Sequence, residues 1–142
     1  MAYRHTQPGT QMLLLSVPTG LLVAAMAWRA GQGPSALVVI GLMLVIDVLF
    51  SSLTVEVGEG ELRWYFGPGL WRYRLPLADI KDVGIVRNRW WSGWGIRMAP
   101  GLRLYNVSGF DAVELRIGPA DIRRIGTDDP QGLAEALKTQ RR

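Results

Sequence analysis

The chain of 142 residues contains no cysteine and a single histidine, His5. Without cysteine there can be no disulfide, thiolate zinc site, cysteine-ligated iron–sulfur cluster or cysteine nucleophile. One histidine near the N-terminus argues against a multi-histidine metal site and against a histidine-based catalytic triad. We therefore expect a protein that is not an enzyme, with no catalytic residues, no metal site and no cofactor.

Charge is scarce in the first third of the chain. Residues 1–52 carry only three charged side chains, whereas the remaining 90 residues carry 14 basic and 11 acidic ones. Two apolar runs of 17 and 18 residues lie there, separated by a short turn. At about 1.5 Å per residue each run extends roughly 26 Å, close to the thickness of a hydrocarbon core. The sequence predicts an N-terminal tail at 1–11 and a two-helix transmembrane hairpin at 12–53, with spans 12–28 and 36–53.

The distribution of arginine predicts how this hairpin is oriented. Arg4 precedes the first run and three arginines lie at 63–74, whereas only Arg29 lies on the turn between the runs. Because positive residues collect on the cytoplasmic side, we expect a multi-pass protein with both termini in the cytoplasm. The alternative is a signal peptide, since Ala25-Met26-Ala27 imitates a cleavage site. The second apolar run directly after it favours the hairpin.

Beyond the second run the pattern changes to one typical of strands. Over residues 53–75, apolar and polar residues alternate in short segments divided by glycine turns, as in a β-meander. Pro130 and the apolar stripe from Leu133 to Leu137 then predict a C-terminal helix at 130–139. We expect 54–142 to form an all-β domain, a partly open barrel capped by that helix. Its seven or so expected strands lie near 53–57, 62–66, 71–75, 80–86, 102–106, 112–117 and 121–125.

Three sequence segments and the N-terminus resemble a known bacterial family. The segments are Trp-Trp-Ser-Gly-Trp-Gly-Ile-Arg at 90–97, Leu-Tyr-Asn-Val-Ser-Gly-Phe-Asp-Ala-Val-Glu at 104–114 and Arg-Ile-Gly-Thr-Asp-Asp-Pro at 124–130, and the start is Tyr-Arg-His-Thr-Gln at 3–7. They resemble small membrane proteins of unassigned function that join two transmembrane helices to a bacterial PH-like (pleckstrin-homology) domain. The resemblance implies a PH-like fold for 54–142 and a place in the bacterial inner membrane.

One segment combines positive charge with tryptophan. Residues 83–110 contain no acidic side chain, but four arginines and three tryptophans. The arginine fork suits phosphate or carboxylate groups, and tryptophan favours interfaces. The segment is therefore a candidate for docking anionic lipid headgroups or a protein partner, unless the tryptophans fill the core and the arginines are solvated. The candidate binding residues are Arg87, Arg89, Trp90, Trp91, Trp94, Arg97 and Arg103.

Three residues in the apolar runs are candidates for helix packing. Asp47 places a costly carboxylate in the second run, Pro18 kinks the first, and Gly20 lets a second helix approach closely. We expect them to serve helix packing rather than ion transport, because two spans make a poor transport pathway.

These patterns together predict a membrane-anchored, non-enzymatic binding or scaffolding module. The alternative is an accessory subunit that stabilises a larger membrane complex or oligomer through its hairpin. The expected partners are membrane lipids and a protein in the membrane. A nucleic acid is not expected, because 14 basic against 11 acidic residues make a weak basic footprint.

Overall fold

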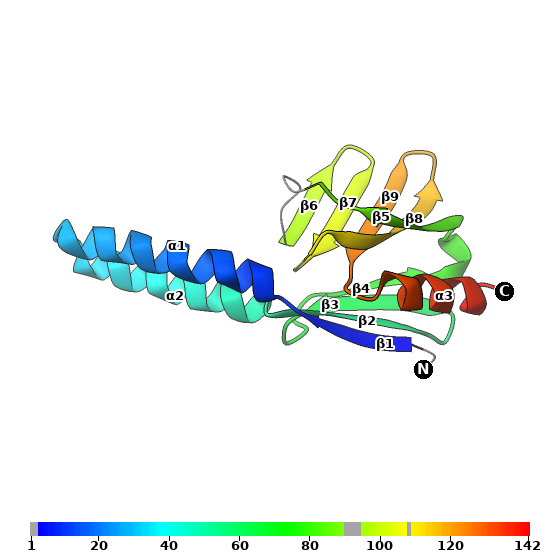
Figure 1. The fold of residues 1–142 in the computed structure, drawn as a ribbon, viewed down its shortest axis with the longest axis horizontal. Helices are drawn as coiled ribbons and strands as arrows, with labels where there is room; N and C mark the ends of the chain where they lie inside the picture. Colours follow the sequence, from blue (N-terminus) through cyan, green and yellow to red (C-terminus); the bar gives the residue numbers. More distant parts are fainter. Residues whose placement is uncertain (1–2, 90–94, 108) are drawn as a thin grey trace.

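The computed structural model describes residues 3–89, 95–107 and 109–142. A mostly-β domain carries a pair of long helices that project from one end of it (Figure 1). The elements are β1 (Tyr3–Pro8), α1 (Thr10–Arg29), α2 (Gly33–Leu49), β2 (Ser52–Gly58), β3 (Glu61–Phe66), β4 (Arg72–Pro76), the 3₁₀ turn η1 (Leu77–Asp79), β5 (Asp82–Arg87), β6 (Gly95–Ala99), β7 (Leu102–Asn106), β8 (Asp111–Gly118), β9 (Asp121–Gly126) and α3 (Pro130–Gln140).

The strands form two sheets that pack face to face. The first is an antiparallel sheet of four strands in the order β1-β2-β3-β4, and the second has five strands in the order β5-β8-β9-β7-β6. The β-meander expected over 53–75 is confirmed as β2-β3-β4 of the first sheet. In the second sheet β7 pairs with β9 in parallel, with Leu104 beside Arg124. The β6–β7 hairpin is attached to the edge of the β5-β8-β9 group through that parallel pair.

The long helices interrupt a pair of neighbouring strands. The β1–β2 ladder ends at Pro8 opposite Ser52, and the chain enters α1 after Gly9 and leaves α2 at Phe50. The Gly9 amide donates to the Ser51 carbonyl at 2.8 Å, which continues the ladder to the helix ends. The helical pair therefore takes the place of the turn in a β-hairpin. Two chain connections, rather than one linker, join it to the sheet.

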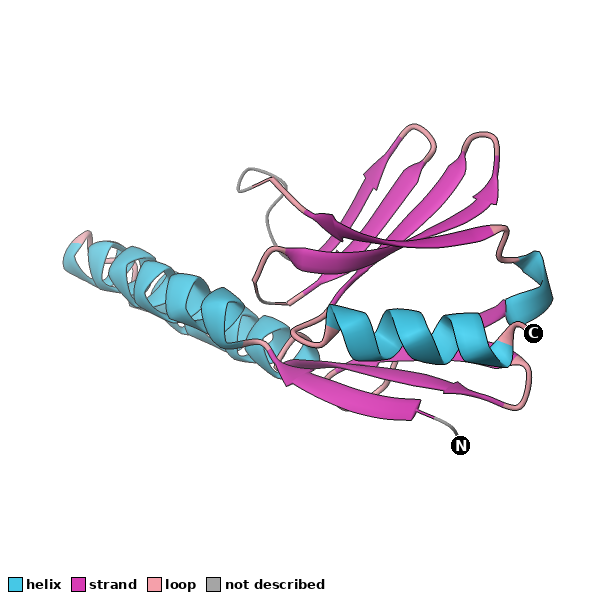
Figure 2. Ribbon diagram, turned by 45° about the vertical axis from the view of Figure 1, so that its right-hand side comes forward, coloured by secondary structure: helices cyan, strands magenta, loops and turns pink. Residues whose placement is uncertain are grey.

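The core fills the space between the sheets and beneath α3. Trp64, the largest buried side chain, stacks on Tyr73 and meets the ring edge of Tyr105 at a centroid distance of 5.2 Å. Helix α3 lies across β2 of one sheet and β5 and β8 of the other (Figure 2). It buries the predicted apolar stripe, including Leu133 and Leu137. The expected C-terminal helix is confirmed, and it covers one open side of the sandwich.

Two strands were not foreseen in the sequence. β1 lies inside the segment expected to be an N-terminal tail, and β6 lies inside the segment rich in arginine and tryptophan. β1 pairs with β2 and contacts the residues that lead into α3: the Tyr3 hydroxyl donates to Asp129, the N-cap of α3, at 2.9 Å, and His5 contacts Asp128. The described residues thus contain nine strands rather than about seven.

The helices also differ from the expected bounds. The second one begins three residues early, because Pro34 suits its first turn, and ends at Leu49 because the residues from Ser52 pair with β1. Helix α1 has the length and apolar composition to cross a membrane, whereas α2, at 17 residues, is a shorter apolar helix. Fifteen large apolar side chains of these two helices are exposed.

Candidate functional site

Three connections of the β domain gather beside the base of the helices; we call them the hairpin-facing end. They are the β3–β4 turn at 67–71, the end of β5 at 87–89, and the described part of the β7–β8 connection, 107 and 109–110. The Gly109 amide donates to the Gln11 side chain in the first turn of α1 at 2.7 Å. The backbone amide of Asn88 donates to the Phe110 carbonyl at 2.6 Å. These bonds tie the second sheet to α1.

The β3–β4 turn makes the matching contact with α2. Gly67 has a positive φ of 50°, and a Cβ built on it would lie 2.4 Å from the Val48 carbonyl oxygen and 2.7 Å from that of Leu49. The turn therefore fits against the end of α2 because this residue has no side chain. Its amide donates to the Ser52 carbonyl at 2.8 Å, which fixes the turn to the start of β2.

Beyond that contact, the β3–β4 turn presents large apolar side chains to the solvent. Leu70 is 71% exposed and Trp71 is 53% exposed. Leu70 and Pro68 join the last turns of α2 in lining an apolar hollow of about 370 Å³. The strand expected near 71–75 included Trp71, but β4 begins one residue later, at Arg72. Two apolar residues after Gly-Pro-Gly, where a turn is ordinarily polar, were the available signal.

Arginines flank these apolar residues. Arg72 lies over the Tyr65 ring with its guanidinium carbon 4.6 Å from the centroid, and its Nε donates to the Gly69 carbonyl. Arg87 lies over Phe110 at 5.6 Å and is 3.5 Å from an Asp111 oxygen. Arg87 and Arg89 are both exposed. The hairpin-facing end thus combines exposed cations and apolar groups.

The four predicted arginines do not form one cluster. Arg87 and Arg89 lie at the end of β5, at the opposite edge of the five-stranded sheet from Arg97 on β6. Arg97 pairs with Leu104 in register, so alternation puts Arg97 and Arg103 on opposite faces of the sheet. Two of the four therefore belong to the hairpin-facing end. Trp90, Trp91 and Trp94 lie outside the described residues.

Asn88 lies between Arg87 and Arg89 in the sequence, and its side chain is buried. Asn88 is 5% exposed, and neither the nitrogen nor the oxygen of its side-chain carboxamide has a hydrogen-bond partner within the described part of the chain. An unpaired buried carboxamide costs about 1–3 kcal/mol.

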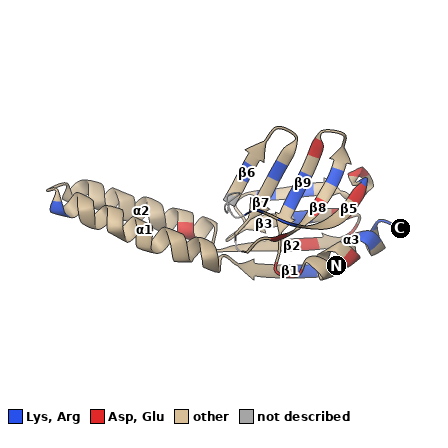
Figure 3. Cartoon of the chain, turned by 45° about the horizontal axis from the view of Figure 1, so that its top comes forward, with Lys and Arg blue, Asp and Glu red and all other residues tan. Residues whose placement is uncertain are grey.

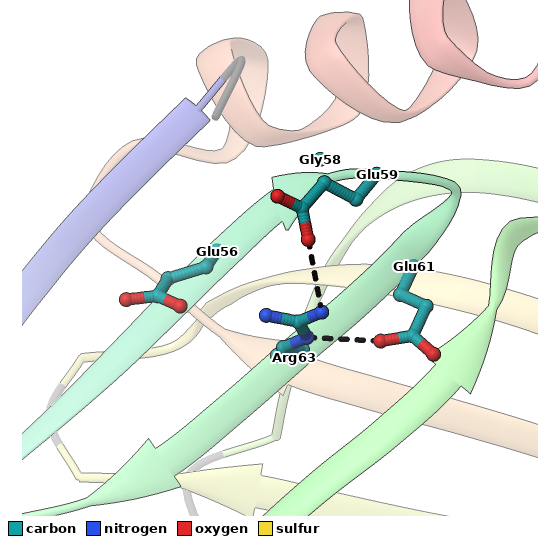
Figure 4. Close-up of a pocket in the computed structure, with 5 residues that line it drawn as sticks. All are labelled: Glu56, Gly58, Glu59, Glu61 and Arg63. Carbon is teal, nitrogen blue, oxygen red and sulfur yellow. Dashed lines mark hydrogen bonds and ion pairs between the residues drawn. The ribbon is translucent and has the colours of Figure 1, made fainter.

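The charged hollow at the β2–β3 turn has the opposite character (Figure 4). Arg63 is held by Glu61 at 2.9 Å and by Glu59 at 3.4 Å, and Glu56 completes the lining. The two paired carboxylates, Glu61 foremost, raise the pKa of Arg63. Glu56 also pairs with Arg4 at 3.4 Å. Three carboxylates against two guanidinium groups still leave a net negative charge there, which repels phosphate. This agrees with the acidic sequence of that turn.

The helix-packing candidates find partners within the helical pair. A Cβ on Gly20 would overlap the Met43 side chain, so this glycine makes room for the neighbouring helix. The Ser16 hydroxyl donates to Asp47 at 2.5 Å. Pro18 is exposed and lines an apolar hollow of about 420 Å³ on α1. Gly20 and Asp47 thus have internal roles, and only Pro18 faces outward.

Charge divides the molecule along its length (Figure 3). Between Thr10 and Leu49 the only charged residues are Arg29, at the turn, and Asp47.

Among the described residues, no three His, Asp or Glu side chains are placed to hold a metal ion. No family model matches the chain, and no curated protein matches its sequence.

Proposed function

We propose that this protein is a membrane-anchored, non-enzymatic binding module. Helices α1 and α2 form a two-span transmembrane hairpin, and the β domain, PH-like in architecture, docks its hairpin-facing end on anionic lipid headgroups. The observation that carries the proposal is that exposed arginines, Leu70 and Trp71 occur together at the end of the domain where both helices enter. The exposed apolar surface of the helices supports the same orientation.

Apolar burial at the headgroup boundary and the attraction of arginine to anionic lipid both favour this docking. An exposed tryptophan and leucine next to the last turn of α2 fit the headgroup boundary, where an apolar body and one N–H group are both accommodated. Each arginine near an anionic surface contributes about 1 kcal/mol. Arg72, Arg87 and Arg89 would together contribute about 3 kcal/mol. This attraction falls off within a Debye length of about 10 Å, so it requires the domain to lie against the membrane.

The same placement orients the hairpin. The hairpin-facing end carries three exposed arginines, whereas the turn between the helices carries only Arg29. By the positive-inside rule the β domain and both termini lie in the cytoplasm. The resemblance to the bacterial family implies that the membrane is the inner membrane of a bacterium.

A test of the lipid preference uses the full chain reconstituted with spin-labelled lipids. We expect spin-labelled phosphatidylglycerol to be motionally restricted by the protein more than spin-labelled phosphatidylcholine, and salt to reduce the difference. The triple variant Arg72→Gln, Arg87→Gln, Arg89→Gln should lose most of the preference. The matched control is the triple variant Lys81→Gln, Lys138→Gln, Arg142→Gln, which removes three charges at the other end of the domain. This control should keep the preference for phosphatidylglycerol.

Equal restriction of the two lipids by the unaltered protein would refute the lipid-docking function. So would an equal loss of preference in the triple variant and its control, because the charge would then act without regard to position.

An accessory subunit of a larger membrane complex is the second candidate. The observation that favours it is the apolar hollow of about 420 Å³ beside Pro18 on α1, which side chains of another helix could fill. Mild-detergent purification of the full chain tests it. Stoichiometric recovery of another membrane protein, lost when Val17→Trp fills the hollow, would support this candidate. A preparation of the single chain alone would contradict it.

A further inference from the structure

A second pair of arginines lies far from the hairpin-facing end, on the face of the five-stranded sheet that is turned toward the four-stranded sheet. Tyr105 of β7 marks this inner face, because its ring contacts Trp64 and Tyr73 of the other sheet. Arg103, two residues earlier on β7, shares the face by strand alternation. Arg123 of β9 stands directly beside Arg103 in the parallel register. Figure 3 shows basic residues on both strands.

This arrangement is electrostatically incomplete. Like charges side by side on neighbouring strands are destabilising. The nearest carboxylate to Arg123 is that of Asp121, 3.7 Å from Nε, and Arg103 makes no ion pair with any residue that the structure describes. The Arg123 side chain is only 18% exposed, and its Nε is buried without a hydrogen-bond partner in the described chain. Of the two cations, only Arg123 thus has a carboxylate within 4 Å among the described residues, at 3.7 Å.

A hollow lies beside Arg103, the more exposed member of the pair. Arg103, Met98 and Asp121 line a hollow of about 430 Å³ between the β6–β7 and β8–β9 turns. That volume is in the range of small-molecule sites, about 300–1,000 Å³. Met98, which pairs with Arg103 on the same face, is 72% exposed, so the opposite sheet does not cover this part of the inner face.

We propose that Arg103 and Arg123 form a binding site for a phosphate-type oxyanion. Two guanidinium forks on adjacent strands can each donate to separate oxygens of one phosphate group. The bound anion supplies negative charge that the pair lacks. The site stands apart from the lipid-docking residues and does not rest on the proposed function.

The test uses the full chain with [¹⁵N]arginine, in zwitterionic micelles, titrated with inorganic phosphate against sodium chloride at matched ionic strength. We expect the Nε–H signals of Arg103 and Arg123 to shift in a saturable way with one common dissociation constant. Arg103→Gln should weaken binding about 10-fold or more, as expected for a lost charge-assisted bond. Arg97→Gln is the matched control, because it removes the same charge from the opposite face, and it should change binding by less than about 2-fold.

Two further arms identify the source of the phosphate. Glycerol 3-phosphate represents a soluble ligand, and bicelles containing phosphatidic acid represent a lipid headgroup; saturable shifts with either support the site. Absence of a saturable shift with all three probes would overturn the proposal, as would equal weakening by Arg97→Gln and Arg103→Gln. Because Arg123→Gln could unfold the chain, the exposed Arg103 carries the decision. A negative result leaves the phosphatidylglycerol preference untouched, so the two proposals fail separately.

Discussion

Replacing Gly67 with alanine tests whether the β3–β4 turn truly sets the β domain against the helices. The residue has a positive φ, which costs an L-residue about 1–2 kcal/mol. The new Cβ would also lie 2.4 Å and 2.7 Å from two carbonyl oxygens at the end of α2, and these backbone atoms cannot turn aside. Displacing the turn adds roughly 1–3 kcal/mol by analogy with overpacked cores. We expect a total loss of about 2–5 kcal/mol.

Gly60 provides a matched control in the same sheet. It also has a positive φ, 76°, but nothing lies within 4 Å of the position of its Cβ. Gly60→Ala therefore carries only the conformational cost, about 1–2 kcal/mol. The difference between the two variants isolates the contact between the turn and α2.

Thermal unfolding of the full chain in detergent, followed by circular dichroism of the strands, measures both variants. A loss of 1 kcal/mol lowers the melting temperature of a domain this size by roughly 4–8 °C. We expect Gly67→Ala to melt at least about 4 °C below Gly60→Ala. Equal melting temperatures would refute the close packing of the turn on α2, and with it the geometry that brings Leu70 and Trp71 to the base of the helices.

Two further variants test other contacts. Ser16→Ala removes the hydroxyl that donates to Asp47, and should lower the free energy of unfolding by about 1–3 kcal/mol. The control Thr19→Ala removes a hydroxyl that donates to the Leu15 carbonyl of the same helix, and should lower it by less. Equal losses in thermal unfolding would contradict the role of the Ser16–Asp47 pair. Burial, followed by the bond to Asp129 and that carboxylate's charge, raises the pKa of Tyr3, so the associated stability is present below pH 10 and falls as the pH rises above it. Melting temperatures measured from pH 9 to pH 12 should fall less in Tyr3→Phe than in the unaltered protein, and parallel curves would contradict this.

The sequence identified elements whose signals are local. The uncharged run became α1, and the proline with its apolar stripe became α3, since both depend on neighbours within a few turns. β1 was missed because its polar sequence acquires a buried face only through β2 and α3, which lie far along the chain. The parallel pairing of β7 with β9 is likewise decided by tertiary packing, which the alternation of apolar and polar residues along one strand does not reveal.

The candidate site was predictable only in part, for the same reason. Shared charge suggested that Arg87, Arg89, Arg97 and Arg103 act together, but strand order and pleat separate them into different edges and faces. Leu70 joins the site only because Gly67 lets its turn approach α2. Proximity in the sequence could not reveal either relationship, since each depends on how distant strands and helices meet.

The most direct test of the account measures how deeply three positions lie in a bilayer. The chain has no cysteine, so single cysteines carrying a fluorophore can replace Leu42 on α2, Leu70 on the β3–β4 turn and Glu59 on the β2–β3 turn. In vesicles containing phosphatidylglycerol, lipids with a spin label deep in the acyl chain should quench position 42, and lipids with a headgroup label should quench position 70. Position 59 should be quenched only by a water-soluble agent. A position 42 as open to the aqueous quencher as position 59 would contradict the membrane-anchored account, and a position 70 insensitive to headgroup labels would contradict the docking of the domain.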